Sequence, residues 1–372
     1  WSRFLRYDPT APDWPDRDRF ILSAGHGCAL LYALLHLAGY DLSLDDIKDF
    51  RQWGSRTPGH PEFGHTVGVE ATTGPLGQGI SNGVGAALAS RMLAARFNGD
   101  TEFDPVDHRI YVLASDGDVM EGVSGEACSV AGHLGLSNLI VLYDDNRITI
   151  EGGTGLTFSE DVLRRYEGYG WSTCRVDGHD HEAIARAIEA ARADGDCPSL
   201  IALRTHIAHG APNKQDTSDS HGAPLGPEEV RAAKEQAGWP LEPTFHDPAE
   251  VIGFFNTRAR EGAARRRKWE QALVGWRSRD QDRSRQWDAF LERTVPGDVV
   301  DRLLAAAPDG DGATRAHSGT VLQKAADYVP CLVGGSADLA PSNKSVIKGS
   351  PAVSVEDFKG RNLHFGIREH AM

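Results

Sequence analysis

Two polar residues, Asp116 and Asn146, each stand just past a short apolar run of the kind that forms a β-strand. The runs are residues 109–114 (RIYVLA) and 138–143 (NLIVLY), and a helix rich in Ala, Gly and Ser is expected between them at 121–134. Ligands of open α/β sheets bind outside the carboxyl ends of the strands, so neighbouring strands would bring the two side chains together. A carboxylate, an amide oxygen and a backbone carbonyl then form an oxygen-only ligand set, which suits Mg²⁺.

The same position suits a diphosphate. Gly117 lets the backbone approach a ligand closely, and the N-terminus of the following helix favours anions. The formal net charge of the chain is −14, so a phosphate ligand needs a locally positive or metal-assisted site. This charge also argues against nucleic-acid binding. The simpler alternative for Asp116 and Asn146 is an acidic turn with a helix cap, where Asp and Asn are favoured anyway.

Three histidines, His26, His60 and His221, each lie in a loop rich in Gly or Pro. Such loops are exposed, and they can hold an imidazole close to a ligand. A lone histidine in a loop is more often an ordinary surface residue. The three do not have the spacing of zinc ligands, so a zinc site is not favoured.

Some motif matches do not fit their surroundings. Residues 79–83 match the GxSxG pattern of hydrolases, and 77–83 resemble a dinucleotide-binding loop. Neither follows a convincing hydrophobic strand, which both functions require. A literal GDG at 310–312 follows an Ala-rich helix and is interpreted as a loop.

The elements that must position these residues alternate between strands and helices from residue 1 to about 240. A helix at 181–193 and a strand at 199–207 continue the alternation, and a further helix is expected to begin near Ser81. Apolar runs without strict alternation, separated by helices, indicate a parallel sheet covered on both faces. Residues 1–240 are therefore predicted to form an α/β domain.

The remaining sequence changes character twice. Residues 241–312 contain long Arg-rich helical stretches and are interpreted as a helical connector. Residues 313–372 are predicted to be the start of a second α/β domain, with a helix at 313–327 and a strand at 331–334. About sixty residues are fewer than a free-standing domain usually needs for its own core.

Composition sets the broad class. Hydrophobic residues make up 40% and charged residues 25%, as in ordinary globular proteins. No apolar stretch is long enough for a membrane span, so no membrane association is expected. The five cysteines form no CxxC motif, which suits a reducing, cytoplasmic environment. They are Cys28, Cys128, Cys174, Cys197 and Cys331.

Several motifs together resemble one family. SDGDVMEG (115–122) followed by YDDN (143–146) is similar to the thiamine-diphosphate motif, with Ser115 where that motif usually has Gly. Six further segments resemble transketolase signatures in the family's order. They are LSAGHGCALLY (22–32), TPGHPE (57–62), TTGPLGQGISNGVG (72–85), DSHGAPLG (219–226), GGSADLAPSN (334–343) and FGIREHAM (365–372).

The resemblance implies a cofactor site for thiamine diphosphate and Mg²⁺, or another divalent cation such as Ca²⁺ or Mn²⁺. Asp116 and Asn146 would ligate the metal through their side chains and Ile148 through its carbonyl. The other residues implied at the cofactor are His26, Gly74, Leu76, Gly117, Glu121, His221, Asp338 and Glu369. Among them, Glu369 would contact the pyrimidine ring.

The resemblance also implies roles in catalysis and substrate binding. Glu369, His221, His60 and His26 would be the catalytic residues. His60 and His221 would also face the sugar, and Arg315 and Ser342 would hold the substrate phosphate. A guanidinium and a hydroxyl suit that task.

The implied activity is the transfer of a two-carbon ketol unit from a ketose phosphate to an aldose phosphate, through a thiamine-diphosphate carbanion, in the pentose phosphate pathway. Xylulose 5-phosphate would be a donor, and ribose 5-phosphate or erythrose 4-phosphate an acceptor. The family's sites form between two subunits, so a homodimer is implied. Family members extend further at both ends than this chain does, and we expect the 372-residue chain alone to be inactive.

Other functions are considered beside this one. A dihydroxyacetone synthase shares most of the signatures, whereas a deoxyxylulose-phosphate synthase fits TPGHPE and DSHGAPLG less well. A non-catalytic subunit with the same fold is a further alternative, against which the intact polar residues argue. A nicotinamide oxidoreductase does not fit the context of its motif.

Overall fold

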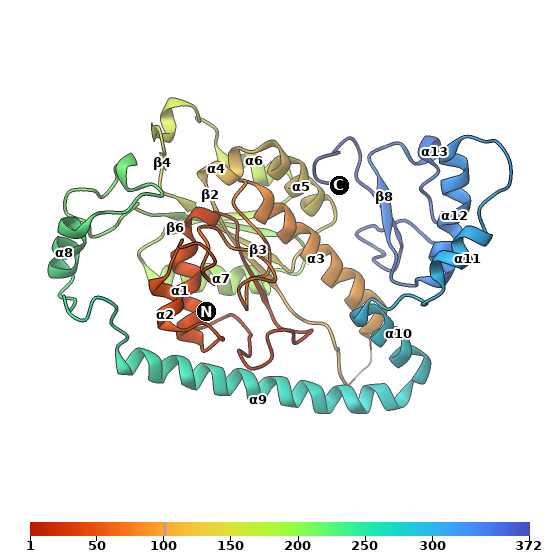
Figure 1. Ribbon diagram of the computed structural model, residues 1–372. Helices are drawn as coiled ribbons and strands as arrows, with labels where there is room; N and C mark the ends of the chain where they lie inside the picture. The colour runs from red at the N-terminus through yellow and green to blue at the C-terminus, as the bar shows by residue number, and fades with distance from the viewer. Residues whose placement is uncertain (100–101) are drawn as a thin grey trace. The chain divides into compact units, whose positions relative to one another are not determined.

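The computed structural model describes residues 1–99 and 102–372. Two compact units make up the chain, and many elements of both are labelled in Figure 1. The first unit comprises Trp1–Leu88 and His108–Arg266, and the second comprises Ala89–Asp107 and Arg267–Met372. The division of the sequence at 240 and 312 stays a prediction.

A parallel five-stranded sheet forms the centre of the first unit, in the order β1-β2-β3-β7-β6. This confirms the predicted α/β fold with a parallel sheet flanked by helices. The strands are β1 (Arg19–Leu22), β2 (Ile110–Ser115), β3 (Leu139–Asp145), β6 (Ser172–Asp177) and β7 (Ser199–Arg204). The middle strands are almost fully buried, which explains their continuous apolar sequences.

Helices cover the sheet on both faces, because an apolar run in a parallel strand must be buried on each side. The helices of this unit are α1 (Cys28–Ala38), α2 (Leu44–Lys48), α3 (Gln78–Phe97), α4 (Asp116–Met120), α5 (Gly122–His133), α6 (Val162–Gly168), α7 (His181–Ala193), α8 (Pro227–Gln236) and the first part of α9 (Ala249–Arg279). The α3 helix continues into the second unit. One core cluster joins Leu35 of α1 and Ile188 of α7 to Ile140 and Ile201 of the sheet.

Short elements complete the first unit. An antiparallel pair, β4 (Ile148–Thr149) and β5 (Gly152–Gly153), follows β3. Single 3₁₀ turns occur at Gly25–Gly27, Thr154–Leu156 and Ser218–Ser220.

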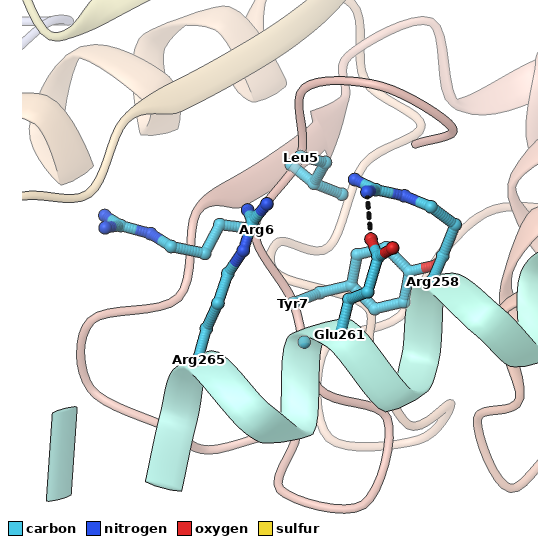
Figure 2. A pocket seen from close by; sticks show the side chains of 7 residues that line it. Leu5, Arg6, Tyr7, Arg258, Glu261 and Arg265 are labelled. Atoms are coloured by element: carbon cyan, nitrogen blue, oxygen red, sulfur yellow. Dashed lines mark hydrogen bonds and ion pairs between the residues drawn. The ribbon is translucent and has the colours of Figure 1, made fainter. Parts of the chain in front are cut away.

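The α9 helix packs closely on the N-terminal segment, as Figure 2 shows. A Cβ atom at Gly262 would overlap the carbonyl oxygen of Tyr7, so the helix comes this near only because position 262 has no side chain. Arg258 Nη1 donates to Glu261 Oε2 at 2.6 Å beside this contact. The cavity here holds about 10 Å³, which is room for no more than about one water molecule.

The second unit has its own aromatic core. Phe97, at the end of α3, lies edge-on to Trp287 with ring centroids 5.2 Å apart, and Trp276 and Leu273 pack beside them. The elements of this unit are α10 (Gln281–Glu292), α11 (Val299–Ala305), α12 (Thr314–Tyr328), α13 (Ala340–Asn343) and the parallel strands β8 (Gly334–Ser336) and β9 (Asn362–His364).

Most predicted elements are confirmed within one or two residues, and the 181–193 helix is exact. The strand expected at 199–207 ends at Arg204, and the helix expected near Ser81 begins at Gln78. The strand predicted at 331–334 is wrong except for Gly334. There the amide of Leu332 donates to Val329, so the apolar residues before Gly334 form the turn that ends α12.

Among the described residues, no helix is both long and apolar enough to pass through a bilayer.

Candidate functional site

The carboxyl ends of β2 and β3 lie side by side. The strands pair in parallel, with Ser115 opposite Asp144, so Asp116 and Asn146 each leave the sheet at the same edge. The predicted neighbourhood of the two strands is therefore confirmed. Both side chains are buried, with Asp116 3% and Asn146 9% exposed.

Asp116 is held by two donors at this edge. Tyr143 Oη donates to Oδ1 at 2.5 Å, and the backbone amide of Arg147 donates to Oδ2 at 3.1 Å. Burial raises the pKa of Asp116 to about 6, and the carboxylates of Asp145 and Asp144 act in the same direction against these hydrogen bonds. A buried carboxylate beside two others is stabilised in its ionised form by a bound cation. The edge therefore fits a divalent metal.

Asn146 is fixed by its own neighbours. Its Oδ1 accepts from the amide of Ile148 at 2.9 Å, and its Nδ2 donates to Asp144 Oδ2 at 3.0 Å. Arg147 between them has a φ of 65°, which turns its amide toward Asp116. The described residues contain no group of three or more His, Cys, Asp or Glu side chains that could hold a metal. The ligand set expected here consists of one carboxylate, one side-chain amide and one backbone carbonyl, and therefore differs from such a group of side chains.

The GPLG loop lies against the turn after β2. A Cβ at Gly117 would come within 2.7 Å of Leu76 Cδ1, and a Cβ at Gly77 within 2.8 Å of Glu121 Cβ. Gly74 has a φ of 146°, and a Cβ at this position would lie 3.4 Å from the ring of His60. The structure thus brings five predicted residues together here, namely Gly74, Leu76, Gly117, Glu121 and His60.

The three predicted histidines also meet. The rings of His26 and His221 stack with centroids 4.7 Å apart. The ring of His26 reaches solvent, but partial desolvation by the surrounding loops lowers its pKa, and the nearby charges of His221 and His60 lower it further. His221 Nδ1 is buried and has no hydrogen-bond partner among the residues described. An imidazole nitrogen left open in this way is suited to bind or move a proton on a ligand.

Sequence reasoning missed Asp118, which is fully buried at the centre of this arrangement. Its Oδ1 accepts from Ser23 Oγ at 2.6 Å and from the Gly77 amide at 2.9 Å. Its Oδ2 accepts from the Ser115 amide at 2.8 Å and from Ser115 Oγ at 2.9 Å. One carboxylate therefore joins the end of β1, the GPLG loop and the end of β2.

The local part of this network had a signal in the sequence. Ser115 and Asp118 have the spacing of a capping box, in which a residue three positions into a helix accepts from the backbone of the cap. The bonds to Ser23 and Gly77 join segments far apart in the chain, and no local pattern could indicate them.

The other predicted residues belong to the second unit, where three of them follow β8 or β9 in the chain and the fourth lies at the start of α12. Asp338 follows β8 and has a φ of 60°, and Ser342 lies in the short α13 helix. Glu369 follows β9, and Arg315 is the second residue of α12. All four are exposed. The Leu339 amide donates to Ser336 Oγ at 2.9 Å, which fixes the turn after β8.

Two models of known families match most of the chain. Residues 1–296 match the model described as "Transketolase, thiamine diphosphate binding domain", and residues 311–372 match "Transketolase, pyrimidine binding domain". The chain is 50% identical over 378 residues to a transketolase of Geobacillus stearothermophilus, covering 100% of this chain and 56% of that protein. It is 46% identical over 374 residues to the transketolase of Bacillus subtilis, with the same shares covered.

Solved structures agree with this similarity. Transketolase from Leishmania mexicana superimposes with a TM-score of 0.95 at 41% identity, over 100% of this chain and 55% of that one. Transketolase from Pichia stipitis in complex with sedoheptulose 7-phosphate gives 0.94 at 42% identity, over 99% and 55%. The chain spans about half the length of the curated relatives it matches.

Proposed function

Because this chain belongs to the transketolase family, we propose that it carries the cofactor and substrate residues of a transketolase. The proposed reaction moves a two-carbon ketol unit from a ketose phosphate such as xylulose 5-phosphate to an aldose phosphate such as ribose 5-phosphate or erythrose 4-phosphate. The names of its relatives support this reaction, and the sugar phosphate bound in the Pichia stipitis structure supports the substrate class.

The observation that carries the proposal is the convergence of Asp116 and Asn146 at one buried sheet edge. These side chains and the Ile148 carbonyl would hold Mg²⁺, or Ca²⁺ or Mn²⁺, with the diphosphate of thiamine diphosphate. The raised pKa of Asp116 supports a cation there, because burial and two further carboxylates disfavour its ionised form. Gly117 would leave room for the diphosphate beside the metal.

The residues around this edge would bind and orient the other parts of the ligands. Thiamine diphosphate, when bound, supplies the carbon chemistry on which two-carbon transfer depends. The Gly74 backbone and Leu76 would line its aminopyrimidine, and Glu369 would exchange a proton with the ring nitrogen. Glu121 would connect to the network that activates the cofactor, near the subunit contact, and Asp338 would lie near the cofactor.

The histidines and the phosphate-binding residues would act on the sugar. His26 and His221 would bind near the diphosphate and move protons at the reacting oxygen, with the open Nδ1 of His221 supporting this role. His60 would orient the sugar hydroxyls. Arg315 and Ser342 would hold the substrate phosphate.

We further propose that the natural protein is a cytoplasmic homodimer of the pentose phosphate pathway, with sites shared between subunits. Family membership supports the dimer, and the scattered, unpaired cysteines support the compartment.

Calorimetry with thiamine diphosphate in the presence and absence of Mg²⁺ tests the cofactor site. We expect Mg²⁺-dependent binding that is lost in Asp116→Ala and retained in Asp309→Ala, which removes an exposed loop carboxylate. Equal binding by both variants would contradict the site. The reaction itself is tested by incubating the natural full-length protein with xylulose 5-phosphate and ribose 5-phosphate, and absence of the seven-carbon ketose product would contradict it.

A further inference from the structure

A second pocket lies in the second unit, away from the residues discussed so far. Its volume is about 430 Å³, within the range of sites that hold small molecules. The C-terminal end of α12, the loop 347–351 and the segment before β9 form its walls. It is lined by Arg96, Gln323, Ala326, Asp327, Ile347, Lys348, Gly349, Ser350, Pro351, Lys359 and Arg361.

The charge of this pocket is opposite to that of the chain. Four of its lining side chains are cationic and one is a carboxylate, in a protein whose net charge is −14. The carboxylate, Asp327, is largely exposed, and it pairs with Lys324 Nζ at 3.4 Å. The cations are Arg96, Lys348, Lys359 and Arg361.

The two arginines are held in place by groups that carry no negative charge. The guanidinium of Arg361 donates to the carbonyls of Ala326, Val329 and Leu332, which caps the C-terminus of α12. Arg96 donates to the Lys359 carbonyl at 3.1 Å. Burial lowers the pKa of Arg96, and the neighbouring charge of Arg361 lowers it further. Burial also lowers the pKa of Arg361, against the nearby charge of Asp327, which raises it. Because burial disfavours the charged form of both guanidinium groups, a bound anion would stabilise them.

The two lysines remain available to a ligand. In the part of the chain that the structure describes, the ammonium groups of Lys348 and Lys359 make no ion pair, and both side chains are exposed. Together with the remaining N–H groups of Arg96, they provide donors from different walls of the pocket. Convergent ammonium and guanidinium donors are typical of phosphate sites.

The loop that carries Lys348 is fixed before any ligand arrives. Gln323 Oε1 accepts from the Lys348 amide at 2.9 Å. Asn362, which is 6% exposed, accepts from the Ile347 amide at 2.8 Å and donates to the carbonyls of Ile347 and Ser350. A loop clamped in this way loses little conformational entropy on binding.

This pocket is distinct from the proposed substrate-phosphate residues of the same unit. Arg315 is the second residue of α12 and Asp327 is the last but one, which separates them by about 18 Å along the helix axis. Arg361 precedes β9, whereas Asp338 and Glu369 follow the carboxyl ends of the strands. The pocket therefore belongs to the opposite edge of the β8–β9 pair.

We propose that this basic pocket binds a phosphorylated small molecule through its phosphoryl group, at a site additional to the transketolase site. A lone phosphate ion would fill only a small part of its volume, so the rest of the pocket has room for the body of the ligand.

Calorimetry at low salt with two probes, inorganic phosphate and glycerol 3-phosphate, tests this site. We expect both to bind saturably and to compete with each other. The double variant Lys348→Gln/Lys359→Gln should weaken both at least about tenfold, because it removes two charge-assisted contacts. Lys359→Arg, which keeps the charge, should bind within about threefold of the wild type.

Two controls separate this site from other causes. Arg267→Gln/Lys268→Gln removes the same charge from the exposed surface of α9 and should leave binding within about twofold. Arg315→Gln removes the proposed substrate-phosphate contact and should also retain it. The proposal is overturned if neither probe binds, if the double variant binds like wild type, if Arg315→Gln alone abolishes binding, or if glycerol 3-phosphate fails to compete.

Discussion

The imidazole rings of His26 and His221 lie nearly parallel, with centroids 4.7 Å apart and planes inclined by 19°. Protonation of either ring places a positive charge beside the other. Desolvation lowers the pKa of His26 most, and the charges of His221 and His60 add to this effect. His26 is therefore held toward its neutral form, in which an imidazole can accept a proton.

We expect His221→Gln to raise the pKa of His26, because a neighbouring charge is removed, while desolvation keeps it below the ordinary value. Titration of the His26 ring signals by NMR measures this directly. The control is His181→Gln at the exposed start of α7, which should leave the titration unchanged. An unchanged His26 titration in His221→Gln would show that the rings are not coupled.

Asp116 makes the metal-free fold less stable as the pH rises. Its pKa is raised from 3.8 to about 6 by burial, so folding favours the protonated form. The ionised Asp116 carboxylate lowers the free energy of unfolding. This effect is absent below pH 4, grows between pH 4 and 6, and is complete above pH 6. We expect Asp116→Asn to stabilise the metal-free protein by on the order of 1–3 kcal/mol at pH 8, and by much less at pH 4.

Urea unfolding of Asp116→Asn and the wild type across this pH range measures the difference. Asp309→Asn, at an exposed loop position, serves as the matched control. Equal effects of Asp116→Asn at pH 4 and pH 8 would contradict the assigned burial effect.

Asp118→Ala should destabilise the first unit by about 2–4 kcal/mol, because its carboxylate is the acceptor for Ser23, Gly77 and Ser115 at a fully buried position. Chemical denaturation followed by circular dichroism gives this value. Asp309→Ala should stay within about 0.5 kcal/mol of the wild type. If Asp118→Ala lowered the free energy of unfolding as little as the control does, the hydrogen bonds to Asp118 would not stabilise the fold.

Substitution of two glycines of α9 by alanine should change the stability of the protein in opposite directions. Gly262→Ala places a methyl group on the Tyr7 carbonyl and should destabilise by about 1–3 kcal/mol. Gly253→Ala meets no atom within 4 Å and should stabilise by about 0.5–1 kcal/mol through helix propensity. Thermal unfolding of both variants tests the pair, and the same sign for both would contradict the close packing at Tyr7.

The position of Asp116 and Asn146 at one edge of the sheet could be predicted because its signal in the sequence is local. Each of Asp116 and Asn146 follows an apolar run, and a parallel sheet places the ends of such runs at one edge. The α7 helix was exact for a similar reason, since Asp180 accepts from the amides at its start and the apolar residues repeat on one face.

What the sequence did not reveal depends on partners distant in the chain. Asp118 appears in the sequence as one more acidic residue after a turn, and only the fold places Ser23 and Gly77 against it. The β8 strand was misplaced because Leu332 and Val333 are as apolar as strand residues. Pairing begins only at Gly334, opposite Asn362.

The Asp118 carboxylate also decides when the segments at the carboxyl ends of β1 and β2 and the GPLG loop become ordered. It fastens three segments to one another during folding, so their loss of freedom is part of the folding equilibrium and not of ligand association. A ligand that binds beside these segments therefore meets backbone that is already ordered, and its affinity depends on the contacts it makes and not on the rearrangement of loops.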